Sequence, residues 1–186
     1  MPVWKMPLHE QPEIVSVSYT PMGIERREAY DHERLCWQIA FFDGPTSVTL
    51  TRGSSRWQFD IAAETVFVIP PHSHRDYVTR RRIYSYTLAF RFASGMGDSA
   101  SLELPAIIDP GPSAGTVRQE LASIADLRET DRFESDLQAW LLLCRLARLA
   151  RITSRAQHDA VTVVQATLLR IRENIADVSL TPESLA

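Results

Sequence analysis

The sequence predicts an α+β fold, in which an antiparallel β-barrel or sandwich forms the first part of the chain and helices follow it. Three observations predict this order. Apolar and polar residues alternate with a period of two as far as residues 83–92, which is typical of half-buried strands. From residue 113 onward the apolar residues recur at helical spacing. Between the two parts lies 102–112, a segment whose prolines interrupt regular structure.

Six short strands are predicted in the first part, with turn residues between them. Asp43-Gly44-Pro45 and residues 52–55 have the composition of turns. Pro70-Pro71 cannot donate to a strand ladder and therefore ends the strand before it. Intervals of about 8–12 residues between strands favour a barrel or a sandwich. The predicted strands are Ile14–Tyr19, Leu35–Phe42, 47–51, 56–61, Val66–Ile69 and Ile83–Phe92.

Two helices are predicted after the proline-rich segment. The first begins after Ser113, whose hydroxyl is a candidate N-cap. The second spans Asp131–Thr153 and is apolar over more than half of its circumference, so it must be covered from two sides. We expect the barrel to cover one side. A second copy of the chain is expected to cover the other side, through Trp140, Leu142, Leu143, Leu146 and Leu149.

The end of the sequence predicts the beginning of another helical unit. A third helix is expected over His158–Ile175, and a further one begins at Thr181 with Pro182 at its first position. A helix of about five residues cannot hold itself together. We therefore expect the sequence to stop inside a second domain.

The composition is that of a globular protein and limits its partners. The net charge of −3 does not favour the barrel as a surface for nucleic acid, which usually requires a basic excess. Cys36 and Cys144 form neither a metal-binding spacing nor a disulfide framework. Met1–Pro12 lacks the layout of a signal peptide, and the longest apolar run, Ala139–Cys144, is too short to span a bilayer. We expect a cytoplasmic protein with no membrane partner.

Three stretches resemble the AraC/XylS family of bacterial transcription regulators. Val164–Ala186 resembles the opening of the family's DNA-binding domain, with Leu180 and Leu185 at matching positions. Glu64–Tyr77 resembles the strand, Pro-Pro, His and Tyr passage of the family's cupin barrel. Tyr84–Phe92 resembles the closing strand of that barrel.

The resemblance implies three parts and a function. Residues 1–112 would form a cupin-like (jelly-roll) barrel with an N-terminal arm. A separate hypothesis is that Trp4 anchors this arm and that the arm folds over the barrel mouth. Residues 113–156 would form a helical dimerisation segment, and 157–186 would begin a helix-turn-helix domain. We therefore expect the effector-sensing and dimer-forming part of a regulator that binds operator DNA only through its C-terminal domain. It would be a homodimer without enzymatic activity.

The expected site for a small-molecule effector lies inside the barrel, and the sequence does not name the effector. Strand 83–92 leaves two orientations open: either Ser85 and Thr87 point into the barrel, or Tyr84 and Tyr86 do. Sugar-binding members of the family have His and Trp at the positions of Ser85 and Thr87, so a sugar is not supported. The tryptophans among the candidates can instead belong to the core, and Arg27 can be solvated. The ligand-binding candidates are Arg27, Trp37, Trp57, His72, His74, Tyr77, Ser85 and Thr87.

His72 and His74 form a His-x-His pair of the kind that metal-binding cupins use. The acidic ligand that should follow is absent, since those positions are Val78 and Thr79. The family also usually has Gly where this sequence has His72 after the Pro-Pro pair. With neither a nucleophile–base set nor a phosphate loop evident, we predict no metal and no cofactor. The alternatives are a metal-dependent cupin enzyme, such as a dioxygenase or isomerase, and a structural oligomerisation domain with a filled barrel.

Overall fold

The structure is a computed structural model that describes residues 1–8, 11–23, 27–28, 35–93 and 102–151, with backbone alone at 27, 28 and 102. The chain divides into two compact units, Met1–Ala150 and Arg151–Ala186. The barrel and the two helices described after it, as far as Ala150, belong to the first unit. The helices predicted over His158–Ile175 and from Thr181 lie outside the described residues.

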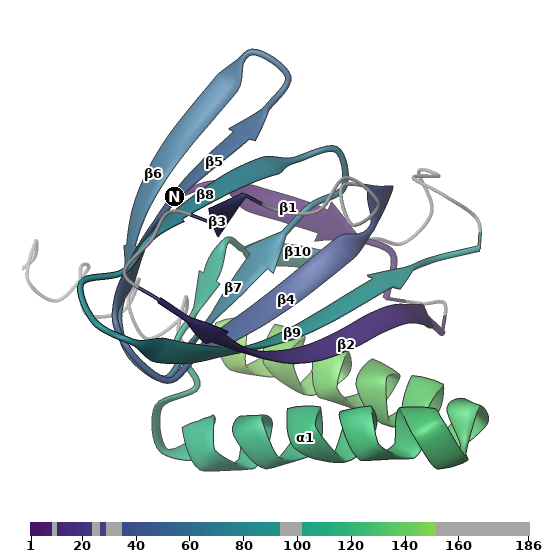
Figure 1. Cartoon of the computed structure of the whole chain (residues 1–186). Helices are drawn as coiled ribbons and strands as arrows, with labels where there is room; N and C mark the ends of the chain where they lie inside the picture. The colour runs from purple at the N-terminus through teal and green to yellow at the C-terminus, as the bar shows by residue number, and fades with distance from the viewer. Residues whose placement is uncertain (9–10, 24–26, 29–34, 94–101, 152–186) are drawn as a thin grey trace, which may run out of the picture. The chain divides into compact units, whose positions relative to one another are not determined.

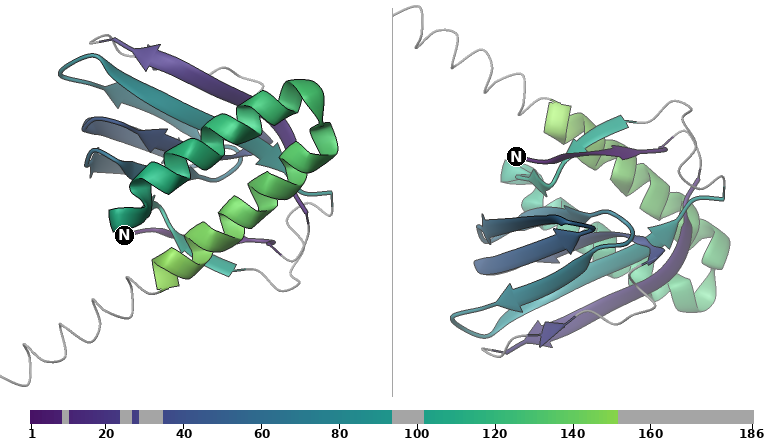
Figure 2. Two further views of the ribbon diagram at one scale, coloured as in Figure 1. Left: turned by 90° about the horizontal axis from the view of Figure 1, so that it is seen from below. Right: turned by 90° about the horizontal axis from the view of Figure 1, so that it is seen from above.

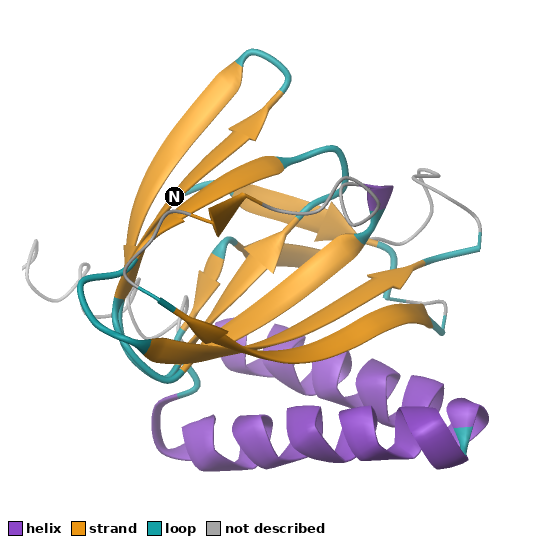
Figure 3. Ribbon diagram, viewed as in Figure 1, coloured by secondary structure: helices purple, strands orange, loops and turns teal. Residues whose placement is uncertain are grey.

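The described residues form strands first and helices afterwards, as predicted (Figures 1 and 3). A second helix follows α1, begins at 132 and is described as far as 151. The elements are β1 (Val3–Met6), β2 (Glu13–Met22), β3 (Arg27–Glu28), β4 (Trp37–Phe42), β5 (Thr46–Arg52), β6 (Ser55–Ile61), β7 (Thr65–Ile69), β8 (His74–Val78), β9 (Ile83–Arg91), β10 (Leu102–Pro105), β11 (Ile107–Ile108), the 3₁₀ turn η2 (Gly111–Ser113) and α1 (Ala114–Thr130).

Strands β2 to β9 form one long antiparallel hairpin that is rolled up. β2 pairs with β9, β3 with β8, β4 with β7, and β5 with β6. Further pairing of β4 with β9 and of β5 with β8 rolls the hairpin into two sheets. Their strand orders are β11-β7-β4-β9-β2 and β3-β8-β5-β6. This connectivity is a jelly roll, the arrangement that cupins share, so the predicted fold class is confirmed.

Contacts between the two sheets show which face of each strand points inward. The side chain of Arg75 on β8 donates a hydrogen bond to Oε1 of Gln38 on β4. The ring of Phe42 on β4 meets the ring of Tyr77 on β8 edge-on, with centroids 5.8 Å apart. Because side chains alternate along a strand, these contacts fix the inner face of every strand in register with β4 or β8. The polar residues of this inner face include Ser18, Thr20, Gln38, Arg75, Ser85 and Thr87.

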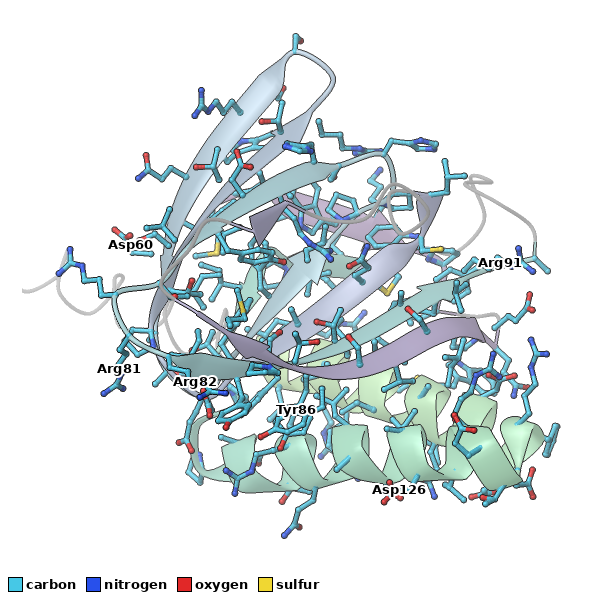
Figure 4. All side chains as sticks on the ribbon, viewed as in Figure 1. Asp60, Arg81, Arg82, Tyr86, Arg91 and Asp126 are labelled. Carbon is cyan, nitrogen blue, oxygen red and sulfur yellow. The ribbon has the colours of Figure 1, made fainter. Side chains whose placement is uncertain are left out.

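The two helices cover the outer face of the β11-β7-β4-β9-β2 sheet (Figures 1 and 2). Leu88 and Phe90 of β9 are fully buried on this face, and Ile39 of β4 lies opposite Leu88. Tyr86 lies on the same side, between the sheet and α1 (Figure 4). Of the two orientations left open for strand 83–92, the structure has the one with the aromatic face under the helices.

The second helix is held against α1 along its length. Asp131 accepts a hydrogen bond from the backbone N–H of Glu134 at 3.0 Å, which caps the start of the helix. Arg145 forms an ion pair with Glu120, and Ser123 hydrogen-bonds Gln138. The two helices thus form one layer that covers the sheet.

Three of the five residues predicted for the dimer surface are buried within the single chain. Leu142, Leu143 and Leu146 are 1%, 0% and 0% exposed, because the sheet and α1 cover the second helix from within the same chain. Trp140 is half-buried and its ring N–H donates to the carbonyl of Leu8 at 3.0 Å. Leu149 is half-buried against the core.

The N-terminal arm is a strand of the folded body. β1 pairs with β10, which lies within 102–112, the segment predicted to be a proline-rich connector. Pro105 is accommodated there because an edge strand does not need every donor. Trp4 is 6% exposed, its ring N–H donates to the carbonyl of Val68 at 3.1 Å, and its ring meets Trp57 edge-on at 5.5 Å. The arm therefore contacts the inner face of the barrel through Trp57.

A β-bulge in β2 connects the barrel to both helices. The register shifts between Ile14 and Ser16. The N–H of Ile14 donates to Asp136 of the second helix at 3.0 Å, and its carbonyl accepts from Arg128 of α1 at 2.9 Å. Each helix thereby satisfies one backbone group of Ile14, which fixes where the helical layer meets the sheet.

Ser113 directly precedes α1, as predicted, but its side chain makes no capping hydrogen bond. The 3₁₀ turn η2 leads into the helix instead, and Asp109 accepts a hydrogen bond from the N–H of Gly111 at 2.8 Å. The start of α1 was therefore predicted at the right residue, but the predicted capping hydrogen bond from the Ser113 side chain is not formed.

Candidate functional site

A buried arginine is the centre of the polar region inside the barrel. Arg75 is 5% exposed and lies on the inner face of β8. Its guanidinium donates to Gln38 across the interior and lies 5.6 Å from the centroid of the Tyr77 ring, within the range of a cation–π interaction. A buried charge is costly unless polar groups surround it, so this region is specialised for hydrogen bonding.

Hydroxyl groups line the inner face of β9 and β2. Ser85 Oγ and Thr87 Oγ1 are 3.2 Å apart, within hydrogen-bond distance. Thr20 lies opposite Ser85 and Ser18 opposite Thr87 in the β2–β9 ladder. Ser18, Thr20 and Thr87 are partly exposed, so solvent reaches this part of the inner face. Each hydroxyl can both donate and accept a hydrogen bond.

The structure brings together four of the eight predicted ligand-binding side chains. Trp57, Tyr77, Ser85 and Thr87 all lie on the inner face. For Arg27, only the backbone is described, and it pairs with Tyr77.

Three of the predicted site residues lie elsewhere. Trp37 is opposite Phe90 on the helix-covered face, where it is buried as a core residue. His74 is on the outer face of β8 with Asp76, and His74 Nε2 lies 3.5 Å from a carboxylate oxygen of Asp76. His72 is exposed in the turn before β8. The alternation of side chains along a strand explains why His74 points outward, because Arg75 and Tyr77 occupy the inward positions of the same strand.

His72 has a backbone φ of 62°, in the left-handed region that favours glycine. This is the position at which the resembled family usually has Gly. A histidine fixed in this turn and exposed to solvent belongs to the loop rather than to the barrel interior.

Arg75 and Gln38 were missed in the sequence analysis. The signal that identifies Arg75 is its spacing of two from Tyr77, since such residues share one face of a strand. That signal was not used, because residues 74–78 carry a histidine, an arginine and an aspartate and were not predicted as a strand. Gln38 stands between apolar neighbours in β4, where a polar residue at an inner position indicates a buried partner.

The described part of the chain holds neither a cluster of metal ligands nor a membrane-spanning helix. No three His, Cys, Asp or Glu side chains gather there in a way that could hold a metal ion. None of its helices is long and apolar enough to cross a membrane.

Solved structures with similar folds include those of three kinds of protein. A vicilin from tomato is 10% identical, with 47% of this chain and 25% of that chain covered, at a TM-score of 0.34. An oxalate decarboxylase from Bacillus subtilis is 9% identical, with 51% and 24% covered, at a TM-score of 0.37. The AraC-like transcriptional activator CuxR is 11% identical, with 97% and 66% covered, at a TM-score of 0.42.

The chain is similar to an AraC-like activator over 97% of its length. This chain spans about a quarter of the vicilin and decarboxylase chains that it matches, and 66% of the AraC-like activator. No protein-family model matches the sequence, and no curated protein matches it.

Proposed function

We propose that this chain binds a small-molecule effector inside its jelly roll and dimerises, as the sensing part of an AraC-type transcription regulator. The observation that carries the proposal is the polar inner face, where Arg75 and Gln38 lie across the barrel from each other. A barrel that serves only as a scaffold is better filled with apolar side chains, because buried polar groups cost free energy. Solvent access at Thr87 supports a site that a ligand can enter.

The regulatory part of the proposal rests on the sequence resemblance. Residues 157–186, which resemble the opening of a helix-turn-helix domain, would belong to the part that binds operator DNA. A metal-dependent enzyme is less well supported, because His74 and Asp76 lie on the outer face of β8. The inner face offers hydroxyl, amide and guanidinium groups, which suit the recognition of a ligand better than the binding of a metal.

Effector binding is tested by filling the interior. Thr87→Phe places a large ring among the inner-face hydroxyls, so we expect it to abolish uptake of small molecules while the fold is kept. Native mass spectrometry after incubation with a small-molecule extract of bacterial cells measures the uptake. Thr49→Phe is the matched control, since Thr49 is a partly exposed threonine on the outer face of β5. Equal uptake by wild type and Thr87→Phe would rule out a site in the barrel.

The proposed dimer surface is an apolar stripe on the exposed side of the second helix. Phe133 and Leu141 are 70% and 58% exposed, and Leu137 lies between them at helical spacing. Glu134 and Arg148 are equally far from Leu141 along the helix. Two copies packed antiparallel about Leu141 would therefore place each glutamate near the partner's arginine, as a self-complementary two-fold interface requires.

The dimer proposal is tested with Leu141→Arg. A charge at the centre of an isologous interface is repeated in both subunits, so we expect dimerisation to weaken about thirtyfold or more. Sedimentation equilibrium over a range of protein concentrations measures this change. Thr116→Arg, at an exposed position of α1, should keep the wild-type mass. A wild-type protein that is monomeric throughout, or a variant that dimerises equally well, would reject this surface.

A further inference from the structure

We propose that β6, an edge strand of the β3-β8-β5-β6 sheet, pairs antiparallel with β6 of a second copy of the chain, with Arg56 opposite Asp60. This inference goes beyond the proposed function, because it adds a second contact between copies that is separate from the stripe on the second helix. In Figure 1 the β5–β6 hairpin lies at the margin of the barrel with β6 outermost. The pairing would join the sheets of two copies into one continuous sheet.

Among the edge strands of the two main sheets in the described part of the chain, β6 alone is both long and regular. It has seven residues, Ser55–Ile61, and pairs with β5 without a register shift. The edge strands β3 and β11 have two residues each. The edge strand β2 contains the bulge after Ile14 and a proline, Pro21. Short strands, bulges and prolines keep sheet edges from pairing, and β6 has none of these features.

The hairpin turn determines which backbone groups of β6 face away from the sheet. Gly53 has a φ of 57° at the first position of the two-residue turn, so the residues that flank the turn form a hydrogen-bonded pair. Such pairs alternate with non-hydrogen-bonded pairs along an antiparallel ladder. From Ser55 onward every second residue therefore bonds to β5, and the N–H and C=O groups of Arg56, Gln58 and Asp60 face outward. No backbone hydrogen bond between described residues reaches these groups.

A two-fold axis at Gln58 gives the register that satisfies these outward groups. Gln58 would pair with Gln58 of the second copy, and Arg56 would pair with Asp60 at each end. All three pairs are of the hydrogen-bonded kind, so every outward N–H and C=O of the three residues finds a partner. A shift of the register by two residues would place Arg56 opposite Gln58 and leave Asp60 outside the ladder.

The side chains of β6 are compatible with this register. Arg56 and Asp60 are exposed on the outer face, so the pairing sets opposite charges beside each other at both ends (Figure 4). Asp60 Oδ1 accepts from Ser47 at 2.7 Å, which leaves its second oxygen for the arginine of the other copy. Trp57 and Phe59 point to the inner face and pack there on Trp4 and Phe67, so they need not move.

The contact is small, because each copy contributes one strand. Interfaces below about 1,200 Å² are typical of weak association, so we expect the pairing only in concentrated protein. A chain with two different isologous surfaces joins its dimers into larger assemblies. The β6 edge would therefore bring together dimers that the second helix has formed.

The first experiment uses the full chain with Leu141→Arg, which removes the proposed helix contact and leaves β6 unchanged. Amide hydrogen exchange of Arg56, Gln58 and Asp60 is followed by NMR from about 50 µM to about 1 mM protein, the range in which a small interface associates. We expect the protection of these three amides to rise with concentration. Protection that does not depend on concentration would show that the edge is covered from within the chain, and an absence of protection would show that it stays free. Either result would overturn the inference.

The second experiment reverses the charges of the pair in the same Leu141→Arg background. Arg56→Asp sets like charges opposite each other at both ends, so association measured by sedimentation equilibrium should weaken about tenfold. Combining Arg56→Asp with Asp60→Arg restores opposite charges and should restore association. Arg118→Asp, the same charge change at an exposed residue of α1, is the control and should have no effect.

The outcomes separate this inference from the proposed function. Failure of the double reversal to restore association would overturn the β6 register and leave the helix contact standing. Association that Leu141→Arg leaves unchanged and Arg56→Asp weakens would instead reject the helix contact and support the β6 edge. The exchange measurement uses an unsubstituted β6, so it decides the matter even if a charge-reversed variant does not fold.

Discussion

Replacing Leu146 with alanine is expected to lower the free energy of unfolding by about 3 kcal/mol, within the range for a leucine truncated in a packed core. Leu146 is 0% exposed and lies in the part of the second helix that packs on the sheet and on α1. Urea unfolding, followed by tryptophan fluorescence at one fixed protein concentration, measures the change. The effect should appear in the midpoint while the dependence on urea stays the same.

Val78→Ala is the control for Leu146→Ala. Val78 is 54% exposed on the outer face of β8, and its loss should cost less than about 1 kcal/mol. If Leu146→Ala is no more destabilising than Val78→Ala, the second helix does not pack on its own barrel. Leu146 would then be available to a second copy of the chain, as the sequence analysis expected.

Replacing Trp4 with alanine is expected to cost about 3–5 kcal/mol, the range for a buried tryptophan. The truncation removes the ring packed against Trp57 and the hydrogen bond to the carbonyl of Val68. Pairing of β1 with β10 depends on this anchor, so the first strand should detach before the rest of the barrel unfolds. Hydrogen exchange of the amides in β1 and β10 measures this detachment, and thermal unfolding measures the loss of stability.

Trp4→Phe separates the two contributions of this side chain. Phenylalanine keeps a ring beside Trp57 and lacks the N–H donor, so it should be destabilising by about 1–3 kcal/mol, mainly because the carbonyl of Val68 loses its partner. Wild-type stability and unchanged exchange in Trp4→Ala would show that the N-terminal strand is not part of the folded body.

Periodicity in the sequence predicted most of the barrel, because alternation of apolar and polar residues follows directly from the pleat of a strand. The strands around Ile39, Leu50 and Phe59 were identified in this way. Residues 74–78 were not predicted as a strand, since their charged residues lie on both faces. Without that strand, neither the outward position of His74 nor the inward position of Arg75 could be derived.

The dimer surface shows a different limit. The apolar circumference of the second helix indicated that other structure must cover it on two sides. Periodicity alone does not identify the surfaces that cover each side. In the structure α1 and the sheet supply both covers, and this depends on tertiary packing of residues far apart in the chain. Phe133 and Leu141 remain exposed, whereas Leu142 and Leu146 are buried. All four are apolar residues of the same helix, so the sequence pattern does not distinguish the exposed ones from the buried ones.

The strand pairs of the rolled hairpin differ in the length of the chain segment that connects their two strands. β5 and β6 meet at Arg52 and Ser55 across a tight turn, where Gly53 has a φ of 57°. Glu13 and Arg91 pair at the other end of the hairpin although 78 residues separate them. Loop-closure entropy rises with separation, and folding slows as non-local contacts come to dominate. Among the four pairs of the rolled hairpin, we therefore expect β2–β9 to assemble last. This pair also carries the inner hydroxyls and the attachment of both helices.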